Sequence, residues 1–139
     1  MSVASDKLAR IQFLLHESSL FSAQSRVARQ IVVQIKRYFC NPRLLLELPI
    51  QVCGTPLQQK IWQSIRRIPC GKTITYGELA RKIGTSPRVV GNACRCNPIP
   101  VIIPCHRVVA AAGLGGYYGN TVEGLRIKRW LLDHESKKR

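Results

Sequence analysis

The chain has 139 residues, 45% of them hydrophobic, so it can bury one core but not a second of full size. Its 22 Lys and Arg outnumber its 7 Asp and Glu, which gives a formal net charge of +15 at pH 7. This composition excludes wholesale disorder, and no apolar run reaches the roughly 20 residues that span a bilayer. The first residues lack the shape of a secretory signal, so we expect a cytoplasmic protein with reduced cysteines.

The positive charge predicts a polyanionic partner. A polyanion releases counterions when it binds, which favours nucleic acid over an acidic membrane surface, although a merely well-solvated basic surface would also account for the charge. The six cysteines and three histidines show no zinc-like spacing, so we expect no metal site.

Residues 1–54 predict a short helical segment followed by a connector. Apolar residues at helix-like spacing begin the chain: Leu8, Ile11 and Leu15. A second helix is expected behind a cap at Ser22, with one face formed by Val27, Ile31, Ile35 and Phe39. Prolines and a glycine then break helical order over residues 41–54, and the main domain is expected to cover residues 55–139.

The main domain opens with strong helix signals. Thr55, Pro56 and Gln58 combine a capping box with a proline at the first helical position. The buried stripe of this helix is expected to comprise Leu57, Ile61, Ile65 and Ile68. A second capping box at Thr75 and Glu78 predicts a short helix that ends at Gly84.

A further helix is expected from the pair Ser86 and Pro87, and together the two short helices have the outline of a helix-turn-helix. Between Lys60 and Cys96 there are eight basic residues and one acid, which suits a DNA backbone. The stretch around Pro104 predicts a short buried strand, a glycine-rich loop follows, and a closing helix buries Ile127, Leu131 and His134 on one face. The predicted fold class is α+β, mostly helical, with a helix-turn-helix domain of winged-helix type.

The pair Cys105 and His106 is the candidate chemical centre. A cysteine is a good nucleophile only as thiolate, which a neighbouring base can generate. Adjacent residues of a strand point to opposite faces, so the pair can cooperate only if Pro104 turns the backbone or a water bridges the two. The alternative is a buried cysteine beside a surface histidine.

The chain resembles the O6-alkylguanine-DNA alkyltransferases, also called methylated-DNA protein-cysteine methyltransferases, over residues 22–135 and most densely from Thr55. The motifs that carry the resemblance are TPLQQKIWQSIRRIPCGKTITYGELA, Asn97-Pro98, IPCHRV, GGYYG and KRWLLDHE. The resemblance implies a DNA-repair protein that irreversibly takes an alkyl group from O6-alkylguanine in duplex DNA, once per molecule. It also implies a monomer that needs no cofactor and associates with the nucleoid when it is bound to DNA.

The resemblance implies roles for particular residues. Cys105 would accept the alkyl group, His106 would act as base through a water, and Glu135 would hold and polarise that histidine. Tyr76 would donate a proton to the leaving base, and Asn97 would brace the turn before the cysteine segment.

The resemblance also implies how DNA is held. Arg88 would fill the space of a flipped-out nucleotide, and Arg95 would contact DNA from the same helix. The base pocket would be lined by the main-chain carbonyls of Cys105 and Val108 and by the loop around Tyr118 and Gly119.

This sequence departs from the pattern at two places. The part before the catalytic domain is shorter, so the small N-terminal sheet of the family is expected to be truncated or replaced by helices. Asn120 stands where the family has a second glycine, followed by the extra residues 121–123. Two other functions stay open: a lesion-binding alkyltransferase-like protein, against which Cys105 argues, and a thiol hydrolase, which would give no reason for the charge.

Overall fold

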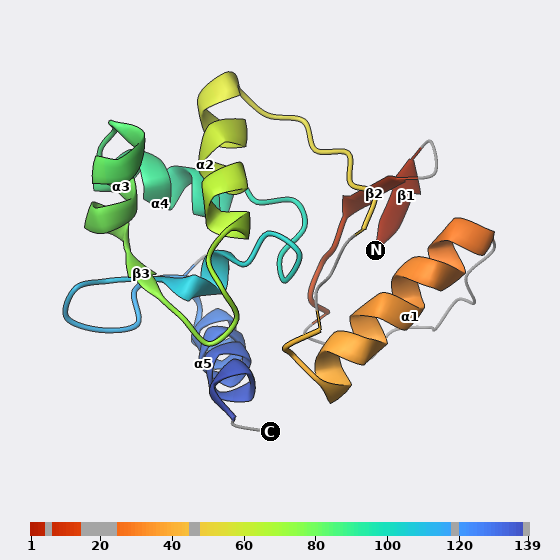
Figure 1. Cartoon of the computed structure of the whole chain (residues 1–139). Coiled ribbons are helices and arrows are strands. Elements are labelled where there is room, and N and C mark those ends of the chain that lie inside the picture. Colours follow the sequence, from red (N-terminus) through yellow and green to blue (C-terminus); the bar gives the residue numbers. More distant parts are fainter. Residues whose placement is uncertain (5–6, 15–24, 45–47, 118–119, 138–139) are drawn as a thin grey trace.

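The computed structural model describes residues 1–4, 7–14, 25–44, 48–117 and 120–137. Its elements are β1 (Ser2–Ala4), β2 (Lys7–Arg10), α1 (Arg26–Cys40), α2 (Pro56–Arg66), β3 (Ile74–Thr75), α3 (Tyr76–Ile83), α4 (Pro87–Arg95), a 3-10 turn η1 (Cys105–Arg107), β4 (Val108–Val109) and α5 (Val122–Ser136). Figure 1 shows α2, α3 and α4 grouped together, with the β1–β2 hairpin and α1 beside them. The predicted fold class, α+β and mostly helical with a helix-turn-helix, is confirmed.

The helix predicted at the start of the chain from Leu8, Ile11 and Leu15 is wrong where the structure describes it, because Lys7–Arg10 forms β2, which pairs antiparallel with β1, and residues 11–14 are not helical. Leu15 lies outside the described residues. The amide of Leu8 donates to the carbonyl of Pro49 at 2.7 Å, and the amide of Gln51 donates to Leu8 at 2.8 Å. Leu8 is fully buried. Pairing with the connector therefore satisfies the backbone as strand, and helix-like spacing of three apolar residues does not outweigh it. A small N-terminal sheet is thus retained in reduced form.

Helix α1 is capped by Ser25, whose hydroxyl accepts from the amide of Ala28 at 3.0 Å. The expected cap, Ser22, lies outside the described residues. Tyr38 rather than Phe39 is buried at the end of the helix, and Phe39 is 43% exposed. The reason is geometric: steps of four residues drift by about 40° each around a helix of 3.6 residues per turn.

Both predicted capping boxes are present, at the starts of α2 and α3. Of the stripe expected on α2, Ile61 and Ile65 are buried, whereas Leu57 is 41% exposed. Trp62 is also buried, and its indole Nε1 donates to the carbonyl of Ala93 at 2.8 Å, which ties α2 to α4. Gly84 ends α3 with a φ of 84°, a conformation that favours glycine.

The expected buried strand around Pro104 is only partly present. Residues 101–107 form turns and η1, and the strand β4 that follows pairs with β3 in parallel. Pro104 cannot donate to a sheet ladder, which accounts for the turn. The closing helix is confirmed as α5, capped by Thr121, with Leu131 and His134 buried. Of the helices in the described ranges, none is both long and apolar enough to cross a membrane.

Candidate active site

The turn after Pro104 decides how Cys105 is presented. Because η1 replaces regular strand geometry, Cys105 and His106 do not have to point to opposite faces, and both are buried. The amide nitrogen Nδ2 of Asn97 donates to the Cys105 sulfur at 3.1 Å and to the carbonyl of Ile103 at 2.8 Å. The Oδ1 of Asn97 accepts from the amide of Ile99 at 3.0 Å. Asn97 therefore braces this turn and contacts the sulfur directly.

His106 is joined to Glu135 by a contact of 2.8 Å between Nε2 and Oε1. The carboxylate accepts, so Nε2 carries the hydrogen and Nδ1 is left with a lone pair. Nδ1 is buried and has no hydrogen-bond partner among the described residues. Burial lowers the pKa of His106, and this outweighs the opposing effect of Glu135. The imidazole is therefore a neutral base at neutral pH.

The carboxylate of Glu135 receives further donors. Arg107 donates from Nε to Oε2 at 2.9 Å and from Nη2 to Oε1 at 2.8 Å, and the Tyr38 hydroxyl donates to Oε1 at 2.6 Å. Burial works to raise the pKa of Glu135, but the hydrogen bonds from His106, Arg107 and Tyr38 outweigh it and hold that pKa far below its usual range. The group is a carboxylate at any pH near neutral.

The sulfur of Cys105 is held as a thiol in the free protein. Its residue is 4% exposed. Burial raises the pKa of the Cys105 thiol, against the opposing effects of the Asn97 amide, the Lys128 ammonium and the Tyr117 hydroxyl. A base must therefore remove the proton before the sulfur can act as a nucleophile.

Cys105 lies in the wall of a cavity of about 580 Å³. The cavity is lined by Tyr76, Pro87, Arg88, Gly91, Asn92, Cys94, Arg95, Cys105, Gly116, Tyr117 and Asn120. More than half of these lining residues come from α4, whose Arg88 and Arg95 are exposed. The cavity thus joins the buried thiol to the basic helix of the helix-turn-helix.

Tyr76 opens α3 and faces the same cavity. Its hydroxyl donates to the carbonyl of Gly116 at 3.4 Å. Burial raises the pKa of Tyr76 to about 12, so the phenol keeps its proton. Gly115 has a φ of 74°, and a Cβ there would lie 2.9 Å from the Tyr76 ring. Glycine is therefore required beside this tyrosine for two independent reasons.

The expected base-pocket residues are only partly accounted for. Val108 does not line the cavity, and its carbonyl accepts from the Lys128 ammonium at 2.7 Å. Tyr118 and Gly119 lie outside the described residues. Asn120 does line the cavity and adopts a φ of 58°, a conformation that asparagine tolerates better than most residues. Of the extra residues after it, Thr121 caps α5.

Lys128 is a site residue that the sequence analysis missed. It is fully buried, donates to the carbonyl of Gly116 at 3.0 Å, and lies 5.7 Å from the centre of the Tyr76 ring. Burial lowers the pKa of Lys128 to about 8, against the opposing effect of its interaction with Cys105. Its spacing in the sequence could have indicated its burial. Lys128 follows Gly124 by four residues and precedes Glu135 by seven, so all three share one face of the helix.

Arg107 and Tyr38 were missed as well. Arg107 also donates from Nη1 to the carbonyl of Ile68 at 2.6 Å. Nothing local in the sequence marks it as the partner of Glu135, 28 residues away. Tyr38 lies seven residues after the buried Ile31, which places it on the buried face of α1 but does not reveal its contact with Glu135.

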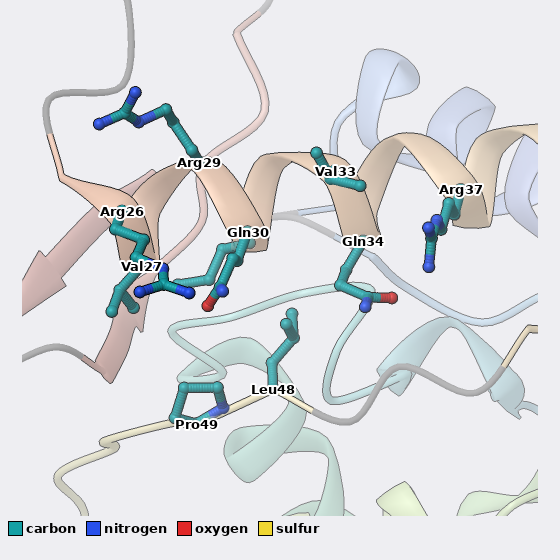
Figure 2. A pocket seen from close by; sticks show the side chains of 10 residues that line it. Arg26, Val27, Arg29, Gln30, Val33, Gln34, Arg37, Leu48 and Pro49 are labelled. Atoms are coloured by element: carbon teal, nitrogen blue, oxygen red, sulfur yellow. The ribbon is translucent and has the colours of Figure 1, made fainter.

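A second hollow of about 750 Å³ lies between α1 and residues 48–49. Figure 2 shows Arg26, Gln30, Gln34 and Arg37 projecting from the helix around it, with Leu48 on the opposite side. The residues that line it include no cysteine, histidine or carboxylate. It carries none of the groups needed for nucleophilic or acid–base chemistry, unlike the cavity at Cys105.

The sequence of this chain matches a known family and several of its members. The family model described as the 6-O-methylguanine DNA methyltransferase DNA binding domain matches residues 56–137. The methylated-DNA–protein-cysteine methyltransferase of Archaeoglobus fulgidus is 37% identical over 116 residues, which are 82% of this chain and 76% of the relative. That of Shigella flexneri is 41% identical over 106 residues, 73% of this chain and 60% of the relative.

The fold also matches solved structures of the same family. A crystal structure of Mycobacterium tuberculosis OGT in complex with DNA superposes with a TM-score of 0.68 at 41% identity, covering 75% of this chain and 63% of that one. The chain therefore spans less than two thirds of the length of several relatives that it matches. The matched residues 56–137 are more than half of the chain and include the cysteine, histidine and glutamate described above, so the chain belongs to the O6-methylguanine DNA methyltransferase family.

Proposed function

We propose that this chain repairs DNA by transferring an alkyl group from O6-alkylguanine to its own Cys105, once per molecule. One observation carries the proposal: the Cys105 thiol lies in the wall of a cavity formed largely by the basic helix α4, and the His106–Glu135 pair follows it on the buried side. A sulfur is a soft nucleophile suited to an alkyl carbon, and the thioether product does not hydrolyse. The reaction therefore ends after one turnover.

The proposed chemistry begins with proton removal. The Cys105 proton passes to Nδ1 of His106 through a water molecule, and the Glu135 carboxylate stabilises the imidazolium that forms. The sulfur then bonds to the alkyl carbon, and the bond from this carbon to O6 breaks with its electron pair left on the guanine. Tyr76 gives the guanine a proton, and the proton held by His106 replaces it through solvent.

The proposed partner is duplex DNA that carries the alkylated base. The target atom lies within the base stack, so the nucleotide must rotate out to reach a buried sulfur. Arg88 and Arg95 are exposed at the cavity on α4, where Arg88 can occupy the vacated space and Arg95 can contact the backbone. The net charge of +15 supports a strong electrostatic contribution to binding.

The proposed working form is a monomer in the cytoplasm. All six cysteines are free. This suits a reducing compartment, in which Cys105 stays available as a thiol.

Intact-protein mass spectrometry tests the proposal. After incubation with a duplex oligonucleotide carrying one O6-methylguanine, we expect the mass of one methylene group on the peptide that contains Cys105. Cys105→Ala should bind the duplex with unchanged affinity and acquire no mass. If the wild-type chain binds the lesion and stays unmodified while its thiols are reduced, the proposal fails and the alkyltransferase-like function takes its place. Repeated turnover of an ester or peptide would instead indicate the hydrolase.

A further inference from the structure

The Tyr38 hydroxyl lies far from the proposed chemistry in sequence but adjacent to it in space. It donates to Oε1 of Glu135 at 2.6 Å across 97 residues of chain, and this is the oxygen that accepts from Nε2 of His106. Tyr38 is 1% exposed, so its hydroxyl is shielded from bulk solvent. The contact comes from α1, which lies before the residues that the family model matches.

The end of α1 is held against α5 by more than this one bond. Nε2 of His134 contacts the Tyr38 carbonyl at 3.0 Å, and the two rings meet edge to face at 5.6 Å. The neighbouring Phe39 packs on Trp130 with ring centres 5.8 Å apart. Aromatic packing alone would thus dock the helix, and a phenylalanine at position 38 would fill the same space. The hydroxyl is needed only for its bond to Glu135.

Oε1 of Glu135 is shared among three donors: the Tyr38 hydroxyl, Nη2 of Arg107 and Nε2 of His106. Each donor withdraws charge from the oxygen, so each weakens the pull of that oxygen on the other two. Burial and the bond to Glu135 raise the pKa of Tyr38 well above its usual range, so it is a permanent donor. The hydroxyl therefore fixes the oxygen in place and limits how strongly it stabilises a protonated His106.

We infer that Tyr38 is a positioning residue for His106, acting through Oε1 of Glu135. This inference rests on the proposed function, in which His106 takes the Cys105 proton. It makes the N-terminal helix part of the reaction machinery. Among the described residues, the ionisable groups around the imidazole besides Tyr38 include Glu135 and Lys128 of α5 and the neighbouring Cys105 and Arg107. Cys70 also belongs to this set, because its thiol interacts with Glu135.

Tyr38→Phe tests the inference through the pH dependence of single-turnover alkyl transfer. With its hydroxyl removed, Oε1 stabilises the imidazolium more strongly, so the pKa of His106 rises and the acid limb moves up by about 0.5 to 1 pH unit. The maximal rate should fall about threefold to tenfold, because Oε1 is less firmly held. Affinity for the alkylated duplex should stay the same, since Tyr38 does not line the cavity at Cys105.

Phe39→Leu is the matched control, because it loosens the contact with Trp130 and keeps the hydroxyl. A purely structural role of Tyr38 predicts a lower rate in both variants with the acid limb unmoved. An acid limb in Tyr38→Phe that coincides with that of the wild type overturns the inference.

Nitrogen NMR of the His106 ring gives a second measurement that needs no DNA. The ring should titrate at higher pH in Tyr38→Phe than in the wild type, and an equal midpoint overturns the inference. The titration midpoint can be measured even if the wild type transfers no methyl group. Failure of the proposed function can therefore be distinguished from failure of this inference. If the variant does not fold, the wild-type Tyr38 hydroxyl proton must still give a downfield, slowly exchanging signal, and its absence overturns the inference.

Discussion

Glu135 and Arg107 form a buried ion pair whose disruption has a calculable cost. The side chain of Arg107 is 11% exposed and that of Glu135 is 1% exposed, and two hydrogen bonds of 2.8 and 2.9 Å join them. Glu135→Gln keeps the shape but turns an amide NH₂ toward the guanidinium. The amide NH₂ of the new glutamine and the guanidinium of Arg107 are then two donors facing each other, and the charge of Arg107 loses its anionic partner.

The expected cost of Glu135→Gln is about 3 to 5 kcal/mol of unfolding free energy, the usual range for breaking a buried pair. This is a large share of the roughly 5 to 15 kcal/mol that holds a domain folded. Arg107→Met should cost a similar amount, since the buried carboxylate loses its cationic partner and keeps only the bonds from Tyr38 and His106. The double variant should cost at least about 2 kcal/mol less than the sum, because no unpaired charge is left.

The pH dependence has a defined sign. The pKa of Glu135 lies below its usual range in the folded protein, so its stabilising contribution is complete above the unfolded value of about 4.3. That contribution is lost as the pH falls through the folded pKa. The wild type should therefore lose stability on acidification more steeply than Glu135→Gln, which has no carboxyl to protonate.

Urea denaturation of the four proteins, followed by circular dichroism at pH 7 and at several acid pH values, measures all of these quantities. Two results would refute the reasoning: a cost below about 1 kcal/mol for Glu135→Gln, or strict additivity in the double variant. Either result would mean that the pair is hydrated or already broken in solution.

Three further predictions concern the cavity and its basic helix. Arg88→Ala should slow transfer from duplex DNA by about tenfold or more and weaken duplex binding by much less, whereas an equal transfer rate in rapid-quench measurements would remove Arg88 from base flipping. Gly91→Ala should raise the unfolding free energy by about 0.5 to 1 kcal/mol, since a Cβ there meets nothing within 4 Å. Gly91→Leu should keep the fold but lower the affinity for duplex DNA, measured by fluorescence anisotropy, because Gly91 lines the cavity. Modification of Cys105 by iodoacetamide should be slow at pH 7 and should accelerate at higher pH than modification of a free thiol, because burial raises the pKa of the Cys105 thiol. A rate at pH 7 equal to that of a free thiol would contradict this.

Local signals in the sequence predicted local structure well. Thr55 and Thr75 each carry their capping partner three residues ahead, so both helix starts could be read from the chain alone. The turn at Gly84 was predictable for the same reason, because the left-handed conformation it adopts favours glycine. Pro104 likewise signalled the break that brings Cys105 and His106 into one buried turn.

The predictions that failed concern contacts between residues that are far apart in the sequence. The β1–β2 hairpin is stabilised by Leu8 bonding to the connector about 40 residues later, which apolar spacing within the segment cannot reveal. Lys128 was hidden for a related reason, since a lysine in a basic helix is usually solvated, and only the carbonyls of Val108 and Gly116 make its burial favourable. Tyr38 and Arg107 likewise converge on Glu135 through tertiary packing alone.

The charges on α5 explain why proton transfer between two buried groups is feasible in the proposed reaction. Moving the proton from Cys105 to His106 creates a thiolate and an imidazolium, which burial disfavours. Lys128 and Glu135 are seven residues apart on one face of α5, about 10 Å along its axis, and the ammonium interacts with the sulfur while the carboxylate contacts the imidazole. Each product charge thus forms under the electrostatic influence of an opposite charge that is already in place and needs no reorganisation. The single helix α5 therefore supplies both counter-charges. In the proposed reaction, the thiol needs the cation at Lys128 and the anion at Glu135 at the same time.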